Sequence, residues 1–530
     1  MKRGAAAIVL LAAVVALPSL RNGFVYDDVL LIVENPLLHT LSRSAGIWQT
    51  SYWPTGGLYR PLTVQLFAIE WAVGSGRPIV FHAMSMLLSA VVAVLVFRLA
   101  ARILPPNRTD LPGRLAPATA AAFFAVHPVH VEVVANAVGQ SELLTALWAL
   151  LAVERYVAWR AAGELTLMRR LGLAGLTLLG IMCKETGYVI PLLLAAAELT
   201  VAGPKRGSRL GSAFALQGAV VAAALLWRLT ELGTLAGDQP ITVLRDLGIG
   251  ARAVAMLAIV PEWARLLLWP ARLQAEYGPP GLPVDPTPGP AHLAGLALLG
   301  LAGVVAWRVH RRQPVLTFGV LWVLIGLAPV SNVLAATGIV LAERTLYLPS
   351  IGVVLALGSM ISAARRRLAG APALARKAVL GAGLGLFTAA LLTSLERQEV
   401  WRSQERFFGQ LVRDAPRSYR AQFVASRFYY GQRRWAEAEA AAREALALYP
   451  LDPQVHEQLG QVLRVQDRCE EATAVLERGL QLNPGGTTIR SRLIECALAV
   501  GDSGRARAVA EEAVRLGQTE FRATLERLAR

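Results

Sequence analysis

The chain has 530 residues, of which 55% are hydrophobic and only 17% are charged, and its formal net charge is +16. A soluble domain carries roughly 25% charged residues and cannot hide this much apolar surface in one core. The composition therefore excludes an ordinary soluble protein and predicts a membrane protein built of many apolar helices. The positive charge does not indicate a nucleic-acid partner, because arginines at the ends of apolar helices are what the positive-inside rule places in the cytoplasm.

Apolar stretches close to the ~20 residues of a spanning helix recur up to about residue 395. The first follows Lys2 and Arg3, as in a cleaved signal peptide, but no small-x-small cleavage site precedes Arg21. We interpret it as a retained span that begins in the cytoplasm. The clearest stretches are 5–20, 79–101, 140–158, 187–203, 213–229, 291–307, 315–330, 345–363 and 377–394.

Basic clusters between these stretches assign the cytoplasmic loops. If the stretch 251–270 also crossed, the basic clusters after it would lie on the outer side, so we predict that it does not cross. Its internal charges suit an amphipathic helix at the outer interface. We predict about eleven spans with a cytoplasmic N-terminus and an external C-terminus. The alternative, twelve spans with a cytoplasmic C-terminal domain, puts basic loops on the wrong side. The clusters are Arg98, Arg102, Arg108 and Arg114; Arg155, Arg160, Arg169 and Arg170; Lys205, Arg206 and Arg209; Arg308, Arg311 and Arg312; and Arg365–Arg367.

Arginine far outnumbers lysine, and Ala, Gly and Leu are abundant. This bias is typical of a GC-rich genome and indicates a bacterial protein. The expected location is therefore the inner (cytoplasmic) membrane, as a multi-pass protein whose C-terminal domain lies in the periplasm.

After Glu396 the sequence becomes charged, rich in alanine and periodic. Pro450 and Pro484 lie 34 residues apart, and Ala438, Ala472 and Ala506 repeat at the same interval. This is the period of the tetratricopeptide repeat (TPR), a pair of packed helices. We predict two domains, a membrane domain at 1–395 and a TPR domain at 396–530, with repeats at 419–452, 453–486 and 487–520. The repeats are either a binding module for a protein or peptide or a structural platform.

Three cysteines form neither a zinc spacing nor a framework of disulfides. Within the repeats, Cys469 begins the second helix of one repeat and Cys496 lies late in the first helix of the next. Antiparallel packing brings these places together, and an external compartment permits a disulfide. Two free buried thiols are the alternative that we favour.

The unusual polar residues all fall in segments assigned to the outside. Charged groups at membrane depth are costly and are therefore suspected of function. Singly, each has an ordinary interpretation, such as a solvated loop or an anchor at a helix end, but their joint placement on one side favours a site. They are Asp27 and Asp28; Arg60; His127, His130 and Glu132; Gln140 and Glu142; Lys184 and Glu185; and Glu343 and Arg344.

As a set, these motifs resemble the transmembrane and TPR-containing O-mannosyltransferases over almost the whole chain. The resemblance implies an all-α fold: a polytopic helical bundle of the C-type glycosyltransferase architecture with a C-terminal TPR solenoid. It also implies transfer of mannose from a polyprenyl phosphate to Ser or Thr. Members of the family often have many repeats, whereas this chain has about three. This difference bears on the identity of the acceptor more than on the type of reaction. The motifs are FVYDD at 24–28, NP at 35–36, YRPL at 59–62, HPVHVE at 127–132, GQSE at 139–142, KE at 184–185 and ERTLYLPS at 343–350.

The chemistry of such a transfer needs a carboxylate base for the acceptor proton and cations for the departing phosphate. Asp28 or Asp27 would be the base, and attack from the opposite face would invert the anomeric centre. Arginine grips phosphate through two donors. The phosphate-binding candidates are Arg344, Arg60 and Lys184, and the supporting polar residues are His127, His130, Glu132, Gln140, Glu142, Glu185 and Glu343.

No cofactor is required by this scheme, but a divalent metal is an open alternative. His127, His130 and Glu132 carry suitable ligand groups, although we favour hydrogen-bonding roles for them. The expected partners are a polyprenyl-phosphate sugar, membrane lipid and a protein or peptide acceptor that the TPR domain could present. Two other functions remain open, namely transfer to a lipid or polysaccharide and a non-enzymatic, membrane-anchored TPR scaffold.

Overall fold

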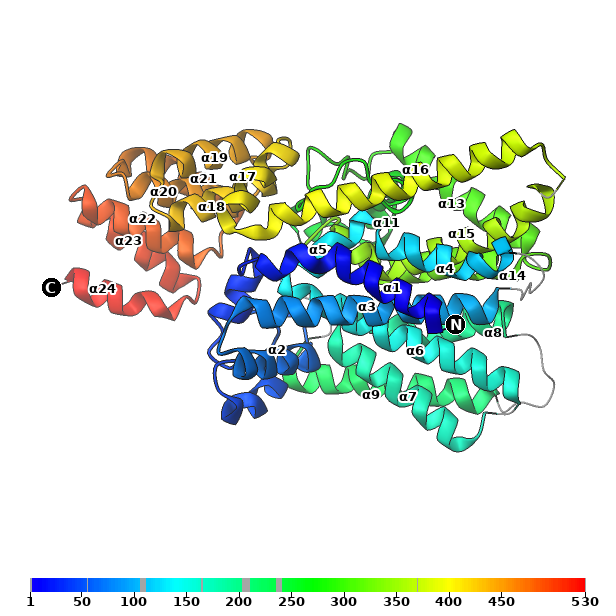
Figure 1. The fold of residues 1–530 in the computed structure, drawn as a ribbon. Helices are drawn as coiled ribbons and strands as arrows, with labels where there is room; N and C mark the ends of the chain where they lie inside the picture. Colours follow the sequence, from blue (N-terminus) through cyan, green and yellow to red (C-terminus); the bar gives the residue numbers. More distant parts are fainter. Residues whose placement is uncertain are drawn as a thin grey trace. The chain divides into compact units, whose positions relative to one another are not determined.

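The computed structural model describes residues 2–54, 56–104, 111–163, 165–202, 210–234, 241–368 and 370–529. Helices dominate this part of the chain, and no β-strand occurs in it beyond one isolated bridge between Pro280 and Ser418. The predicted all-α class is confirmed. The chain forms two compact units: unit 1 comprises 1–275 and 285–407, and unit 2 comprises 276–284 and 408–530 (Figure 1).

Unit 1 consists of apolar helices, most of them long, joined by turns and by longer segments, among them 17–60 and 269–289, whose described residues form no α-helix. One cluster of buried aliphatic and aromatic side chains is contributed by most of these helices, and a separate one lies around the loops that follow residue 16 and around Phe81. The helices are α1 (Lys2–Ala16), α2 (Pro61–Gly74), α3 (Pro78–Ile103), α4 (Leu111–Ala125), α5 (Val131–Ala135), α6 (Gln140–Ala162), α7 (Leu167–Cys183), α8 (Ile190–Thr200), α9 (Leu210–Leu232), α10 (Thr242–Arg245), α11 (Ile249–Leu257), α12 (Val260–Leu268), α13 (Pro290–Val309), α14 (Pro314–Leu327), α15 (Tyr347–Leu368) and α16 (Ala373–Gln398).

Six helical segments among the described residues are long and apolar enough to cross a membrane, and a seventh candidate, bent by 50°, joins α4 to α5. They fit a multi-pass membrane protein. The other spans expected from the sequence fall on α6, α7, α8 and α14. Which loops lie on which side of the membrane remains a prediction. Of the basic residues that mark the cytoplasmic loops, Arg108, Lys205, Arg206 and Arg209 lie outside the described residues. The six are Lys2–Arg21, Pro78–Ile103, Gly211–Leu232, Pro290–Val309, Glu343–Ala364 and Ala373–Arg402.

The stretch 251–270 forms two short helices rather than one long one. Helices α11 and α12 have nine residues each. At 1.5 Å per residue each is about 14 Å long, less than half the ~30 Å of a hydrocarbon core. Neither helix by itself is long enough to cross a bilayer, and the non-spanning character of the stretch remains a prediction.

Small residues allow helices α14 and α15 of unit 1 to approach closely. Gly319 of α14 faces Gly352 of α15, and a Cβ added at Gly319 would lie 2.5 Å from the Gly352 carbonyl oxygen. Beside them, the buried Trp322 donates from Nε1 to the Leu348 carbonyl at 2.9 Å. Contacts between small residues are how helices associate in membranes, where burial of apolar surface gives no driving force between them.

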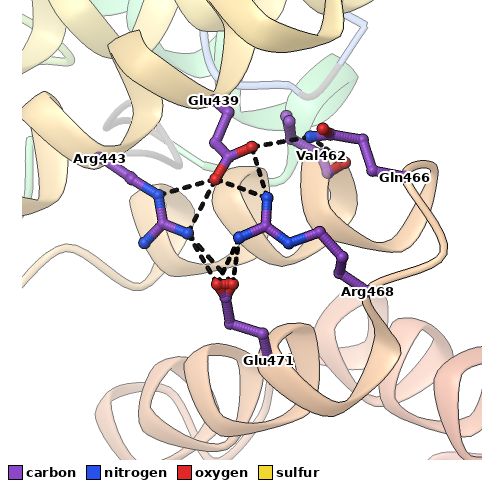
Figure 2. A network of polar contacts seen from close by, with 6 residues as sticks. All are labelled: Glu439, Arg443, Val462, Gln466, Arg468 and Glu471. Atoms are coloured by element: carbon purple, nitrogen blue, oxygen red, sulfur yellow. Dashed lines mark hydrogen bonds and ion pairs between the residues drawn. The ribbon is translucent and has the colours of Figure 1, made fainter.

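Unit 2 consists of helix pairs whose first helices begin at Tyr419, Pro453 and Thr487, at intervals of 34 residues. A polar network joins the first two pairs (Figure 2): Arg443 and Arg468 each bind both Glu439 and Glu471. Gln466 adds a hydrogen bond to Glu439 at 3.0 Å. The helices are α17 (Gln404–Asp414), α18 (Tyr419–Gly431), α19 (Trp435–Leu448), α20 (Pro453–Arg464), α21 (Cys469–Leu482), α22 (Thr487–Ala499), α23 (Ser503–Arg515) and α24 (Arg522–Ala529).

Cys469 and Cys496 are both free thiols in the core of unit 2, with 5% and 0% of their surfaces exposed. Burial, followed by the hydrogen bond of the neighbouring Cys469 thiol, raises the pKa of Cys496 to about 12. Because the thiolate is the reactive form, we expect neither thiol of a Cys183→Ser protein to react with iodoacetamide until the protein is denatured. Intact mass under non-reducing conditions checks this, and a mass lower by two hydrogens would establish a disulfide instead.

Candidate functional site

The two aspartates after α1 point in different directions. The preceding residue, Tyr26, has φ of +58°, in the left-handed region that costs a non-glycine residue about 1–3 kcal/mol. Its ring stacks on Phe407 at 5.1 Å between centroids, which helps hold this conformation. After this turn the Asp28 side chain is fully buried, whereas the Asp27 side chain is 15% exposed.

Asp28 connects two loops that are far apart in sequence. Its carboxylate accepts hydrogen bonds from the backbone N–H groups of Val25 at 3.3 Å, Ala137 at 3.2 Å and Val138 at 2.9 Å. Burial raises its pKa to about 7, although these hydrogen bonds act in the opposite direction. Asn22 reinforces the same junction through the Ala135 carbonyl. The Asp28 carboxylate is thus fully buried, and three backbone N–H groups from two loops donate to it.

Asp27 lies instead beside the guanidinium group of Arg344, with 3.9 Å between Oδ2 and an arginine nitrogen. Glu132, which is 1% exposed, binds Arg344 twice: one carboxylate oxygen accepts from the Arg344 backbone N–H at 2.9 Å, and the other from the guanidinium. The buried glutamate thus fixes the arginine, and the arginine faces the more accessible aspartate.

A second pair is formed by Arg60 and Glu185. The guanidinium donates from Nε to the carboxylate at 2.9 Å, and its carbon lies 4.5 Å from the centroid of the Tyr52 ring. The other oxygen of Glu185 accepts from the Tyr59 backbone N–H at 3.2 Å. Arg60 is therefore held on one side by charge and on the other by an aromatic face, which is a fixed geometry for a cation.

The third pair joins Lys184, in the turn after α7, to Glu142 in the first turn of α6. Burial lowers the pKa of Lys184, Glu142 opposes this, and the positive charges of Arg60 and Arg344 lower the pKa further. Arg60 and Arg344 therefore both act electrostatically on Lys184. The three cations form one electrostatic environment, and each carries a carboxylate partner.

Two close backbone contacts shape these turns. A Cβ added at Gly139, just before α6, would lie 2.2 Å from the Val133 carbonyl oxygen, and one at Gly187 would lie 2.3 Å from the Gly180 carbonyl carbon. Only glycine fits such approaches without a shift of the backbone. These two turns carry Glu142, Lys184 and Glu185 into the site.

The remaining candidates bind the surrounding framework. His127 contacts the Leu267 carbonyl at 3.1 Å, and His130 contacts the Ser350 hydroxyl at 2.8 Å. Gln140 donates to the Phe81 carbonyl at 3.0 Å, and Glu343 accepts from the Gln274 backbone N–H. Throughout the described ranges, no group of three or more His, Cys, Asp and Glu side chains is placed to hold a metal ion, the set of His127, His130 and Glu132 included.

One charged residue of this region was not predicted from the sequence. Arg228 of α9 is 5% exposed, and its guanidinium lies 3.7 Å from Glu185 while donating to the Gly57 carbonyl. The sequence does contain a signal for Arg228, because an arginine within a largely apolar helix usually has a buried partner. Tyr52, the aromatic face under Arg60, belongs to an aromatic-rich stretch and had no assigned role.

Comparison with curated proteins confirms the resemblance seen in the motifs: the chain's curated homologues are TMTC protein O-mannosyl-transferases, 24–34% identical to it. It is 28% identical to TMTC4 of Homo sapiens over 445 residues, covering 74% of this chain and 59% of that protein. With TMTC3 of Mus musculus it shares 24% over 508 residues, or 88% and 54% of the two chains. No protein-family model matches. The chain spans about half the length of the curated relatives it matches.

Proposed function

We propose, from this homology and from the site's geometry, that the chain is a membrane glycosyltransferase acting on proteins. Its donor would be a polyprenyl-phosphate sugar, with mannose as the sugar, and its acceptor a Ser or Thr hydroxyl. The reaction would occur on the periplasmic side of a bacterial inner membrane. The observation that carries the proposal is the carboxylate of Asp27, 15% exposed, beside the guanidinium of Arg344 that Glu132 holds.

In the proposed step, Asp27 removes the proton of the acceptor hydroxyl as its oxygen attacks the anomeric carbon. The bond from that carbon to the phosphate oxygen breaks, and its electron pair leaves with the phosphate. Because one displacement joins the acceptor to the opposite face, the anomeric configuration inverts. Polyprenyl phosphate is already a good leaving group, so no acid is needed, and the cations stabilise its developing charge.

Arg344 is the cation best placed to meet the phosphate during departure, because it lies nearest Asp27. Arg60 and Lys184 would supply the remaining positive potential. Their carboxylate partners, Glu185 and Glu142, would hold them in position before the donor arrives. A preformed arrangement of this kind needs little reorganisation in the transition state, which is the main source of electrostatic catalysis.

The direct test is transfer by the purified chain in detergent from a synthetic polyprenyl-phosphate mannose to a Ser/Thr peptide. We expect a mannosylated peptide with the configuration inverted relative to the donor, measured by mass spectrometry and NMR. Transfer to a glycan or lipid but not to the peptide would favour the second acceptor class. No transfer from any such donor, with the protein folded, would favour the scaffold.

The proposed sidedness gives a separate prediction. A phosphatase that is active only outside the cytoplasm, fused behind the last repeat, should be active in cells, because eleven spans from a cytoplasmic N-terminus end outside. The same enzyme fused between α13 and α14, beside Arg311, is the matched control and should be inactive. The opposite pattern would exclude the eleven-span topology and an external site.

A further inference from the structure

Three arginines converge on one carboxylate at the end of unit 1 remote from the candidate site. Glu154 of α6 is fully buried, and arginine nitrogens lie 2.8 Å (Arg102), 3.3 Å (Arg98) and 3.4 Å (Arg155) from its oxygens. The three arginine side chains remain 39–45% exposed. We call Arg98, Arg102 and Arg155 the arginine cluster.

The position of the cluster follows from two helices that pack side by side, α3 and α6 (Figure 1). Gln140, at the start of α6, binds the Phe81 carbonyl near the start of α3, so the two helices run in the same direction from the end that carries Glu142. Arg102 lies 21 residues beyond Phe81, or about 31 Å along the axis. By the same measure Arg98 lies about 26 Å beyond Phe81, and Glu154 about 21 Å beyond Gln140. Only Arg102 reaches the ~30 Å of a hydrocarbon core, and the long arginine side chains can extend from Glu154 toward the other headgroup layer.

The charge of the cluster exceeds what Glu154 requires. A fully buried carboxylate needs a counter-ion, and Arg102 provides one with a hydrogen bond at 2.8 Å. Arg98 donates a longer hydrogen bond, and Arg155 makes an ion pair without one. In the described part of the chain, Glu154 is the one carboxylate that these arginines contact, so three positive charges face one negative charge.

A guanidinium that is held by one buried oxygen keeps most of its five donors for another acceptor. Three such groups, fixed around one point and able to extend toward the headgroup layer, match the several oxygens of a phosphate. General attraction of basic residues to an anionic membrane would not require a buried carboxylate that draws them together. The geometry is that of a preformed anion site.

We infer that the arginine cluster binds the phosphodiester of an anionic phospholipid headgroup on the membrane face opposite the candidate site. Arg98 and Arg155 supply the free donors, and Glu154 with Arg102 holds the site together. This binding is separate from the proposed transfer reaction, and it requires only that unit 1 spans the bilayer.

Native mass spectrometry of the full chain, extracted from nanodiscs containing phosphatidylglycerol and phosphatidylcholine, tests the inference. The variant Arg98→Gln/Arg155→Gln removes the two surplus charges and keeps the Arg102–Glu154 pair. The matched control is Arg311→Gln/Arg312→Gln, which removes two exposed arginines beyond the end of α13. We expect wild type and control to retain phosphatidylglycerol, and the cluster variant to bind it about 10- to 30-fold more weakly, from roughly fivefold for each arginine.

Equal retention by the cluster variant and the control would overturn the inference, because positive charge in general would then suffice. So would inorganic phosphate binding to the cluster with no retained phosphatidylglycerol, since the ligand would be free phosphate rather than lipid. Circular dichroism identifies a misfolded double variant; the single variants Arg98→Gln and Arg155→Gln then take its place. Each should lose part of the retention, and the inference fails if neither does.

Discussion

Asp27→Asn should abolish transfer while the protein remains folded. The amide cannot accept the acceptor's proton, and loss of a general base typically costs ~10²–10⁴-fold in rate. The side chain is 15% exposed and its ion pair with Arg344 is long, at 3.9 Å. Because Glu132 still neutralises Arg344, the stability change should stay within ~1 kcal/mol. The measurement is kcat for peptide mannosylation, with the thermal midpoint recorded on the same preparation. Glu34→Gln, an exposed carboxylate in the same loop, is the matched control and should keep wild-type activity.

Asp28→Asn should act mainly on stability. The new amide NH₂ would face a backbone N–H at a fully buried position where a carboxylate oxygen now accepts. A buried donor left without an acceptor costs ~1–3 kcal/mol, so the thermal midpoint should fall even where residual activity survives. If Asp28→Asn is stable and inactive while Asp27→Asn retains near wild-type turnover, the two roles are reversed. If both variants keep full activity, the base lies elsewhere.

The Arg344–Glu132 pair should separate donor binding from folding. Arg344→Gln alone leaves Glu132 charged and buried, and removal of one partner of a buried pair costs ~3–5 kcal/mol. The double variant Arg344→Gln/Glu132→Gln replaces the ion pair by two amides that can still hydrogen-bond. We therefore expect the double variant to recover the thermal midpoint but to lose about 10²–10³-fold in kcat/KM. The donor KM should rise as well, because the cation would hold the phosphate before and during departure.

The matched control for this pair is Glu262→Gln/Arg265→Gln on α12. That ion pair is also a glutamate with an arginine at short range, but it is partly exposed and remote in sequence from the site motifs. Its neutralisation should change stability by no more than ~1 kcal/mol and leave transfer intact. A wild-type kcat/KM for the Arg344→Gln/Glu132→Gln protein would remove Arg344 from the proposed mechanism and make Arg60 the next candidate.

Local properties of the sequence are sufficient to predict the helices. Apolar stretches predict long helices because a backbone that leaves water must satisfy its own hydrogen bonds. The 34-residue period predicts helix pairs because its small residues recur wherever two helices must meet. The prediction that 251–270 does not span the membrane also rests on local signals, namely its internal charges and Pro270. The positions of the polar motifs, and their gathering in one region, were likewise visible in the sequence.

The pairing of charges was decided only by the tertiary structure. Nothing local distinguishes Asp27 from Asp28; the difference arises because Tyr26 adopts a left-handed conformation and because backbone N–H groups of residues 137 and 138 meet Asp28 from more than 100 positions away. The partners Glu132 of Arg344 and Glu142 of Lys184 are likewise set by long-range packing. Sequence reports which charges are present, whereas the free energy of burying each depends on the partner that the fold brings to it.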